Sequence, residues 1–73
     1  MAEYSVVLFY STAHAIRAEK LLQRAGYQIK MIPTPRQLSA DCGMALRLER
    51  ADGDRVTAAL EKNKVPFNGI HAI

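Results

Sequence analysis

The spacing of apolar residues predicts a strand followed by a helix in the first third of the chain. Residues 4–10 are β-branched, aromatic and apolar at both alternating positions, which is typical of a central strand covered on both faces. Residues 13–25 place an apolar residue at every third or fourth position, which predicts an amphipathic helix. Ser11 and Thr12 offer the cap at its start, and Gly26 ends it.

The middle of the chain predicts two strands separated by the longest connection. Residues 27–32 are more polar and are followed by Pro33, as expected of an edge strand. Residues 33–43 contain two prolines and a glycine, and connections of this length are disproportionately functional. Residues 44–49 alternate large apolar with small or charged side chains, which predicts a strand with one packed face.

The last third predicts a second helix and a closing strand. Residues 52–54 (Asp-Gly-Asp) can cap a helix that runs to about Lys62, and residues 67–73 can form the last strand. The element order βαββαβ predicts one α+β domain over residues 1–73. We expect the ferredoxin-like architecture, with a four-stranded antiparallel sheet in the order 4-1-3-2 and both helices on one face.

This topology has a consequence for function. If the first and second strands are parallel, both end at the same edge of the sheet. That edge then carries the Ser11-Thr12 turn, the start of the first helix and the loop of residues 33–43. His71, late in the last strand, is expected elsewhere.

Composition sets limits on function. The chain of 73 residues is 49% hydrophobic and 23% charged, which is typical of a small globular domain and leaves no room for a separate cofactor fold. The basic residues behind the net charge of +3 are spread along the chain, which favours a solvated surface over a nucleic-acid stripe. An RNA platform built on Tyr4, Phe9 and Tyr10 is disfavoured, because the third strand contributes only aliphatic and methionine side chains.

The same composition indicates the cellular compartment in which we expect the protein. No apolar run approaches the twenty or so residues of a spanning helix, and we expect neither a signal peptide nor a membrane partner. A single cysteine cannot form an internal disulfide, so a reducing cytoplasm is the expected compartment.

Cys42 is the strongest candidate for chemistry. It lies in the 33–43 loop beside Gly43, and the amides of the first helix together with Arg36 favour a thiolate at the predicted edge. Burial as an inert thiol is an equally weighted alternative, and the adjacent Asp41 opposes thiolate formation. His14 is expected on the surface of the first helical turn rather than as a base. We find no metal-binding or glycine-rich nucleotide motif, and expect no cofactor.

Two motifs resemble the small family described as putative selenium/sulfur carrier proteins. Residues 9–12 (FYST) precede Ala15 and Glu19, and residues 33–43 (PTPRQLSADCG) contain the more specific pattern P-x-P-R-x-x-S-x-x-C-G. The resemblance implies that Cys42 holds sulfur or selenium as a persulfide or selenopersulfide. By position it also implies a binding environment composed of Ser11, Thr12, Arg36, Ser39 and Gly43.

Two hypotheses from different classes follow. In the first, the domain is a carrier rather than a self-contained enzyme, and relays a chalcogen between donor and acceptor proteins. In the second, it is a non-catalytic interaction or dimerisation module with an incidental thiol, and a homodimer is one form of it. A redox sensor that forms intermolecular Cys42 disulfides is a third alternative.

Overall fold

The structure, a computed structural model, describes residues 3–35, 38 and 43–73. The elements are β1 (Tyr4–Leu8), α1 (Thr12–Arg24), β2 (Ile29–Pro33), β3 (Met44–Glu49), the 3-10 turn η1 (Arg50–Asp52), α2 (Gly53–Lys62) and β4 (Ile70–Ala72). The predicted order βαββαβ is confirmed, and η1 is an addition between β3 and α2.

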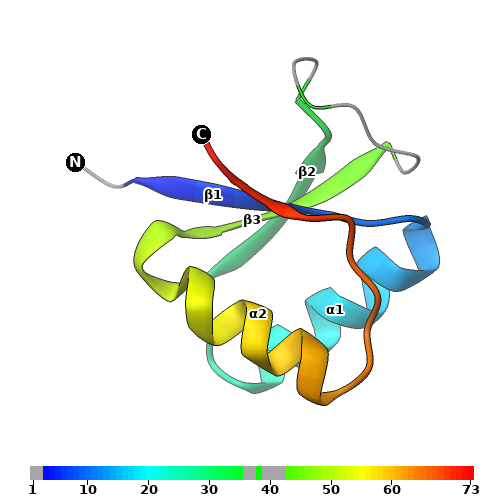
Figure 1. Ribbon diagram of the computed structural model, residues 1–73, viewed down its shortest axis with the longest axis vertical. Helices are drawn as coiled ribbons and strands as arrows, with labels where there is room; N and C mark the ends of the chain where they lie inside the picture. The colour runs from blue at the N-terminus through cyan, green and yellow to red at the C-terminus, as the bar shows by residue number, and fades with distance from the viewer. Residues whose placement is uncertain (1–2, 36–37, 39–42) are drawn as a thin grey trace.

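The four strands form one antiparallel sheet. Its hydrogen-bonded order is β2-β3-β1-β4, which lists the same neighbours as β4-β1-β3-β2 read from the other edge. Because β1 and β2 both pair antiparallel with β3, they run in the same direction. Both helices lie on one side of the sheet (Figure 1). The predicted α+β class, antiparallel sheet and pair of helices are therefore confirmed.

Three strands are shorter than predicted. β2 covers Ile29–Pro33 rather than residues 27–32. β1 ends at Leu8 rather than at residue 10. Phe9 is wholly buried in the same core cluster as Val7, and Tyr10 is half-exposed. β4 covers three residues rather than residues 67–73. Gly69 has φ +102°, outside the extended range, so regular strand geometry begins only after it.

The main core lies between the sheet and the helices. Its buried members are Val7, Phe9, Ala15, Ala18, Leu22, Leu46, Leu48, Val56, Leu60 and Val65. The two helices contribute residues at three- and four-residue spacing, as the hydrophobic pattern predicted. Met31 and Met44, predicted as core residues, are half-buried and pack against this cluster.

A second, smaller cluster lies on the opposite face of the sheet. It consists of Val6, Leu8 and Ala45, with Ile32 and Leu38 packed against it. These strand residues alternate with those of the main core, so they point away from the helices. The prediction that residues 44–49 pack on one face only is therefore wrong at Ala45, which is wholly buried on the other face.

Both helices end in the same hydrogen-bonding pattern. After α1, the amide of Gly26 donates to the carbonyl of Gln23 and that of Tyr27 donates to Leu22, which is a Schellman motif with Gly26 at φ +90°. After α2, Lys64 takes the equivalent left-handed position at φ 56°. A glycine in the sequence therefore marks the end of α1, whereas no glycine marks the end of α2.

The start of α2 differs from its prediction. Asp52 occupies the N-cap position, yet its side chain forms no capping hydrogen bond. The reason is local, because η1 leads directly into the helix and gives Asp52 helical angles of φ −92° and ψ 0°.

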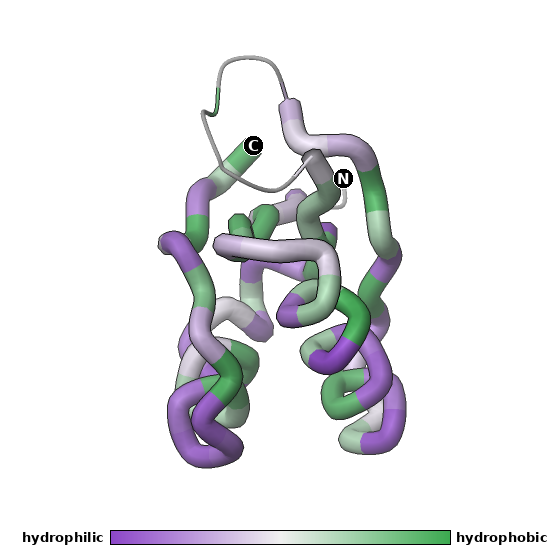
Figure 2. The backbone as a smooth tube through the Cα atoms, turned by 90° about the vertical axis from the view of Figure 1, so that its right-hand side faces the viewer, coloured by the Kyte–Doolittle hydropathy of each residue, from purple (hydrophilic) through white to green (hydrophobic). Residues whose placement is uncertain are grey.

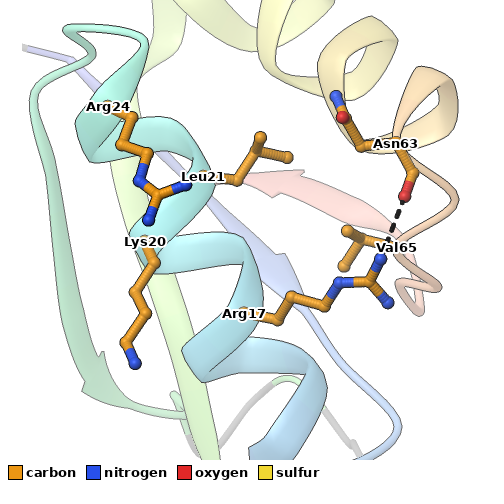
Figure 3. A pocket seen from close by; sticks show the side chains of 6 residues that line it. All are labelled: Arg17, Lys20, Leu21, Arg24, Asn63 and Val65. Atoms are coloured by element: carbon orange, nitrogen blue, oxygen red, sulfur yellow. Dashed lines mark hydrogen bonds between the residues drawn. The ribbon is translucent and has the colours of Figure 1, made fainter.

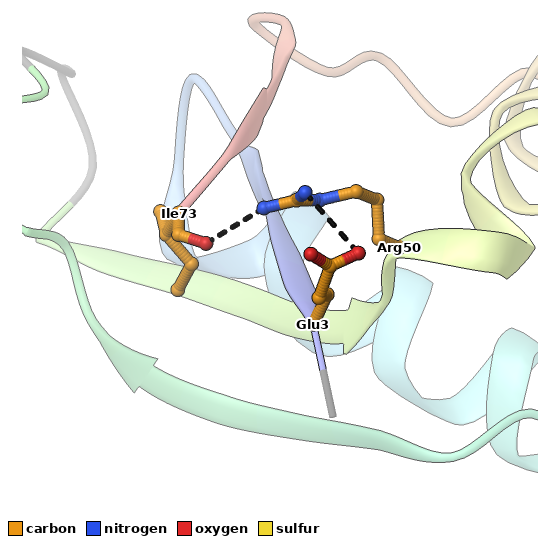
Figure 4. Close-up of polar contacts among 3 residues, drawn as sticks. All are labelled: Glu3, Arg50 and Ile73. Atoms are coloured by element: carbon orange, nitrogen blue, oxygen red, sulfur yellow. Dashed lines mark hydrogen bonds and ion pairs between the residues drawn. The ribbon is translucent and has the colours of Figure 1, made fainter. Parts of the chain in front are cut away.

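An arginine connects the two ends of the described chain. The Arg50 guanidinium contacts a carboxylate oxygen of Glu3 at 3.4 Å and donates to the main-chain oxygen of Ile73 at 2.9 Å (Figure 4). The amide of Ile73 also donates to the carbonyl of Tyr4 at 3.0 Å. These contacts hold η1, the start of β1 and the end of β4 together.

Coloured by hydropathy, the backbone shows apolar segments alternating with polar ones along both helices (Figure 2). Across residues 3–35, 38 and 43–73, neither helix has the length and apolar character needed to cross a membrane.

Candidate functional site

The strand register brings the long loop to the edge at which β1 ends. Leu8 lies opposite Ala45, which in turn lies opposite Ile32, so β1 and β2 finish where β3 begins. The amide of Thr34 donates to the carbonyl of Gly43 at 3.0 Å and closes the base of the 33–43 loop. The sequence prediction that these segments share one edge is confirmed by this register.

Ser11 and Thr12 lie at the same end of the molecule, at the start of α1. Ser11 is the N-cap, and its hydroxyl accepts a hydrogen bond from the amide of His14 at 3.3 Å. Thr12 is the first helical residue and is exposed. Residues 12–15 include no Asp or Glu, so no carboxylate of the first helical turn itself offsets the positive end of the helix dipole. The capping role predicted for this turn is confirmed for Ser11.

Gly43 is exposed at the base of the loop. A Cβ added to Gly43 meets nothing within 4 Å, and the residue does not have the positive φ that would require glycine. As far as the described residues go, the space on the Cβ side of Gly43 is therefore open.

Leu38 is a residue of the loop that the sequence interpretation did not single out. Its amide donates to the carbonyl of Pro35 at 3.0 Å, and its side chain packs against the Val6–Leu8–Ala45 cluster. Leu38 is the only large aliphatic residue between Pro35 and Gly43. A single large aliphatic residue in a polar segment is the sequence signal that could have indicated this packing contact. It attaches the loop to the sheet face opposite α1.

Three of the six predicted site residues lie outside the described part of the chain. These are Arg36, Ser39 and Cys42, and Asp41 lies there too. Their predicted roles stay predictions.

His14 differs from its expected surface position. The residue is half-buried, and its Nδ1 atom is shielded from solvent without a hydrogen-bond partner in the part of the chain that the structure describes. Position 14 is one helical turn before the wholly buried Ala18, so it borders the buried face of α1. His71 is exposed on β4 opposite Val6, and its Nε2 atom lies near Gly69, whose carbonyl accepts from the amide of Leu8 at the end of β1. The expectation that His71 lies away from the loop edge is therefore not confirmed.

Neither of two hollows found in the described residues includes Ser11, Thr12 or Gly43. One lies between α1 and the end of α2, and the other lies beside Tyr4 on the sheet. Arg47 stacks on the Tyr4 ring there, 4.3 Å from its centroid. Among residues 3–35, 38 and 43–73, no three His, Cys, Asp or Glu side chains gather as a metal site.

Comparison with known proteins decides the family. The model of the family described as "Putative Se/S carrier protein-like" matches residues 3–72. The chain belongs to this family. The Se/S carrier-like match extends from β1 through β4 and includes both motifs on which the resemblance rested. No curated protein and no solved structure matches the chain.

Proposed function

We propose that this protein is a carrier of sulfur or selenium, which it holds on Cys42 as a persulfide or selenopersulfide. The observation that carries the proposal is the match of the Se/S carrier-like family to residues 3–72. The element order and the strand neighbours support placing the domain in the ferredoxin-like class.

The chemistry requires one accessible thiolate and two partner proteins. The Cys42 thiolate attacks the outer sulfur of a donor persulfide, so that a new S–S bond forms on Cys42 while the donor's S–S bond breaks and the donor leaves as a thiolate. A nucleophile of the acceptor then attacks the outer atom, and Cys42 leaves as a thiolate. Neither step needs a cofactor or an external oxidant.

The geometry of the described residues supports this assignment in one respect. The loop that contains Cys42 begins and ends at the sheet edge beside the end of β1, from which the chain passes through Ser11 into α1. The first-turn amides of α1 are donors of the kind that stabilise a developing negative charge. In the proposal Ser11, Thr12, Arg36, Ser39 and Gly43 surround the chalcogen.

Sulfur loading tests the proposal directly. The protein is incubated with a cysteine desulfurase and cysteine, and its intact mass is measured before and after reduction with dithiothreitol. We expect the wild type to gain one reducible sulfur atom and Cys42→Ser to gain none. Because Cys42 is the only cysteine in the sequence, a gain in the variant or no gain in the wild type contradicts the proposal.

Substitutions at Ser11 test the contribution of the helix start. Ser11→Asp keeps a capping side chain but introduces a negative charge, whereas Ser11→Ala removes the cap, at a cost of about 1 kcal/mol. We expect iodoacetamide to alkylate Cys42 more slowly in Ser11→Asp than in Ser11→Ala. Gln23→Glu, exposed near the far end of α1, is the charge control and should leave the rate unchanged.

The interaction-module hypothesis is supported by two exposed apolar side chains. Tyr10 is 50% exposed and Ile16 is 43% exposed, one just before α1 and the other in its first half. The alkylation rate separates the two functions, because a thiol that reacts no faster than a simple peptide thiol, or not at all, favours the module.

A further inference from the structure

A basic hollow lies between α1 and the end of α2, away from the proposed site. It has a volume of about 260 Å³ and is lined by Arg17, Lys20, Leu21, Arg24, Asn63 and Val65 (Figure 3). The three basic residues follow each other on α1 at spacings of three and four, so they share one face of the helix.

Two of the three positive charges have no partner in the described part of the chain. The Arg17 guanidinium donates a hydrogen bond to the main-chain oxygen of Asn63 at 3.4 Å (Figure 3). Within the described part of the chain, Lys20 and Arg24 form no hydrogen bond or ion pair, and no carboxylate lines the hollow. Like charges at this spacing repel each other within the helix, and an anion bound between them would relieve that repulsion.

The other residues that line the hollow indicate which kind of molecule would carry the anionic group. Leu21 is half-buried and Val65 is 3% exposed, which adds an apolar surface to the hollow. The side-chain amide of Asn63 already donates to the carbonyl of Ala59 at 2.9 Å. The donors left for a ligand are therefore the cationic groups, which bind carboxylates and phosphates. The apolar surface beside them suits the carbon chain of an acidic residue.

The spacing of the cations fits an extended acidic peptide. Arg24 lies seven positions after Arg17, which corresponds to about 10 Å along the helix axis. Side chains on the same face of an extended segment recur about every 6.5 Å, so carboxylates at alternate positions fall between these cations. We propose that this hollow docks an acidic segment of a protein partner, with acidic residues at alternate positions.

RNA is the less favoured occupant. Proteins that bind single-stranded RNA stack its bases on aromatic side chains as well as on arginine guanidinium groups. The hollow offers guanidinium groups, but no aromatic residue lines it in the described chain. Phe9, one of the aromatic residues weighed for an RNA platform, is wholly buried.

The proposal does not depend on Cys42, and it stands if the sulfur-loading experiment fails. If both proposals hold, this face is where a donor or acceptor protein orients on the carrier.

A titration of the full chain tests the docking site. The probe is a synthetic peptide of alternating glutamate and alanine, and its binding is followed by amide chemical shifts of the isotope-labelled protein at low salt. We expect shifts concentrated at residues 17–24 and 63–65, and reversed by added salt. A uridine oligonucleotide of equal charge is the competing probe and is expected to bind more weakly.

Two double variants make the test specific. Lys20→Gln with Arg24→Gln removes two exposed cations of the hollow, and Lys30→Gln with Arg55→Gln removes two exposed cations elsewhere. Both pairs lower the formal net charge by two from +3, so a nonspecific attraction responds to them equally. We expect the first pair to weaken peptide binding at least about tenfold and the second pair less than about threefold.

The proposal would be overturned by equal losses of binding in the two double variants or by chemical-shift changes outside the hollow. It would also be overturned by tighter binding of the oligonucleotide than of the peptide, or by no peptide binding at low salt.

Discussion

At the residue scale, two glycines lie in open space, yet the backbone requires only one of them. An added Cβ meets nothing within 4 Å at either Gly26 or Gly43. Gly26 has φ +90° and closes α1, whereas Gly43 does not have a positive φ. A β-carbon in the left-handed region costs roughly 1–2 kcal/mol.

This pair yields a matched prediction for stability. We expect Gly26→Ala to lower the free energy of unfolding by about 1–2 kcal/mol, and Gly43→Ala to change it by less than about 0.5 kcal/mol. Urea denaturation measures both. A large loss at Gly43 would mean that the loop base needs a conformation that only glycine adopts.

The site residues were predictable to different degrees. The capping role of Ser11 follows from a short-range rule, since a hydroxyl before a helical pattern bonds to an amide two or three residues on. The half-buried state of His14 did not follow, because it depends on how α1 is rotated against its neighbours.

At the element scale, Leu38 attaches the long loop to the sheet. Its side chain packs against the cluster of Val6, Leu8 and Ala45, on the face without helices. The loop is therefore held at its base by the hydrogen bond from Thr34 to Gly43 and in its middle by an apolar contact.

We expect Leu38→Ala to weaken this attachment. The predicted loss is about 1–2 kcal/mol of unfolding free energy, below the range for fully buried leucines because Leu38 is half-buried. Tryptic cleavage after Arg36, followed by mass spectrometry, should become faster. Ile16→Ala, an exposed aliphatic residue on α1, is the control. Equal cleavage rates in both variants would show that the Leu38 contact does not restrain the loop.

At the scale of the whole molecule, stability comes from the buried clusters rather than from the polar contacts between the chain ends. Leu46 is wholly buried in the main core. The Arg50 and Glu3 side chains are 42% and 67% exposed, and solvent-exposed ion pairs contribute only about 0–1 kcal/mol.

Two variants compare these contributions. We expect Leu46→Ala to destabilise the domain by about 2–5 kcal/mol and Arg50→Gln by less than about 1 kcal/mol. Thermal unfolding followed by circular dichroism measures both. A loss at Arg50 as large as that at Leu46 would indicate that the ends of β1 and β4 control the folding of the whole sheet.

The element order and the core positions followed from the sequence, because they depend on local periodicity. A strand covered on both faces has no polar alternation, and a helix against a sheet repeats its apolar residues every three or four positions. Residues 44–49 were predicted with the bounds that β3 has. The family also followed from the sequence, and the resemblance drawn there is confirmed by the family match over residues 3–72.

Only the tertiary structure decided which residues from distant segments meet. Ala45 is buried in a cluster that includes residues of β1 and is covered by Ile32 and Leu38, and the basic hollow depends on α2 ending beside α1. Local periodicity carries no information about such contacts, since they arise from the strand register and the packing of one element on another.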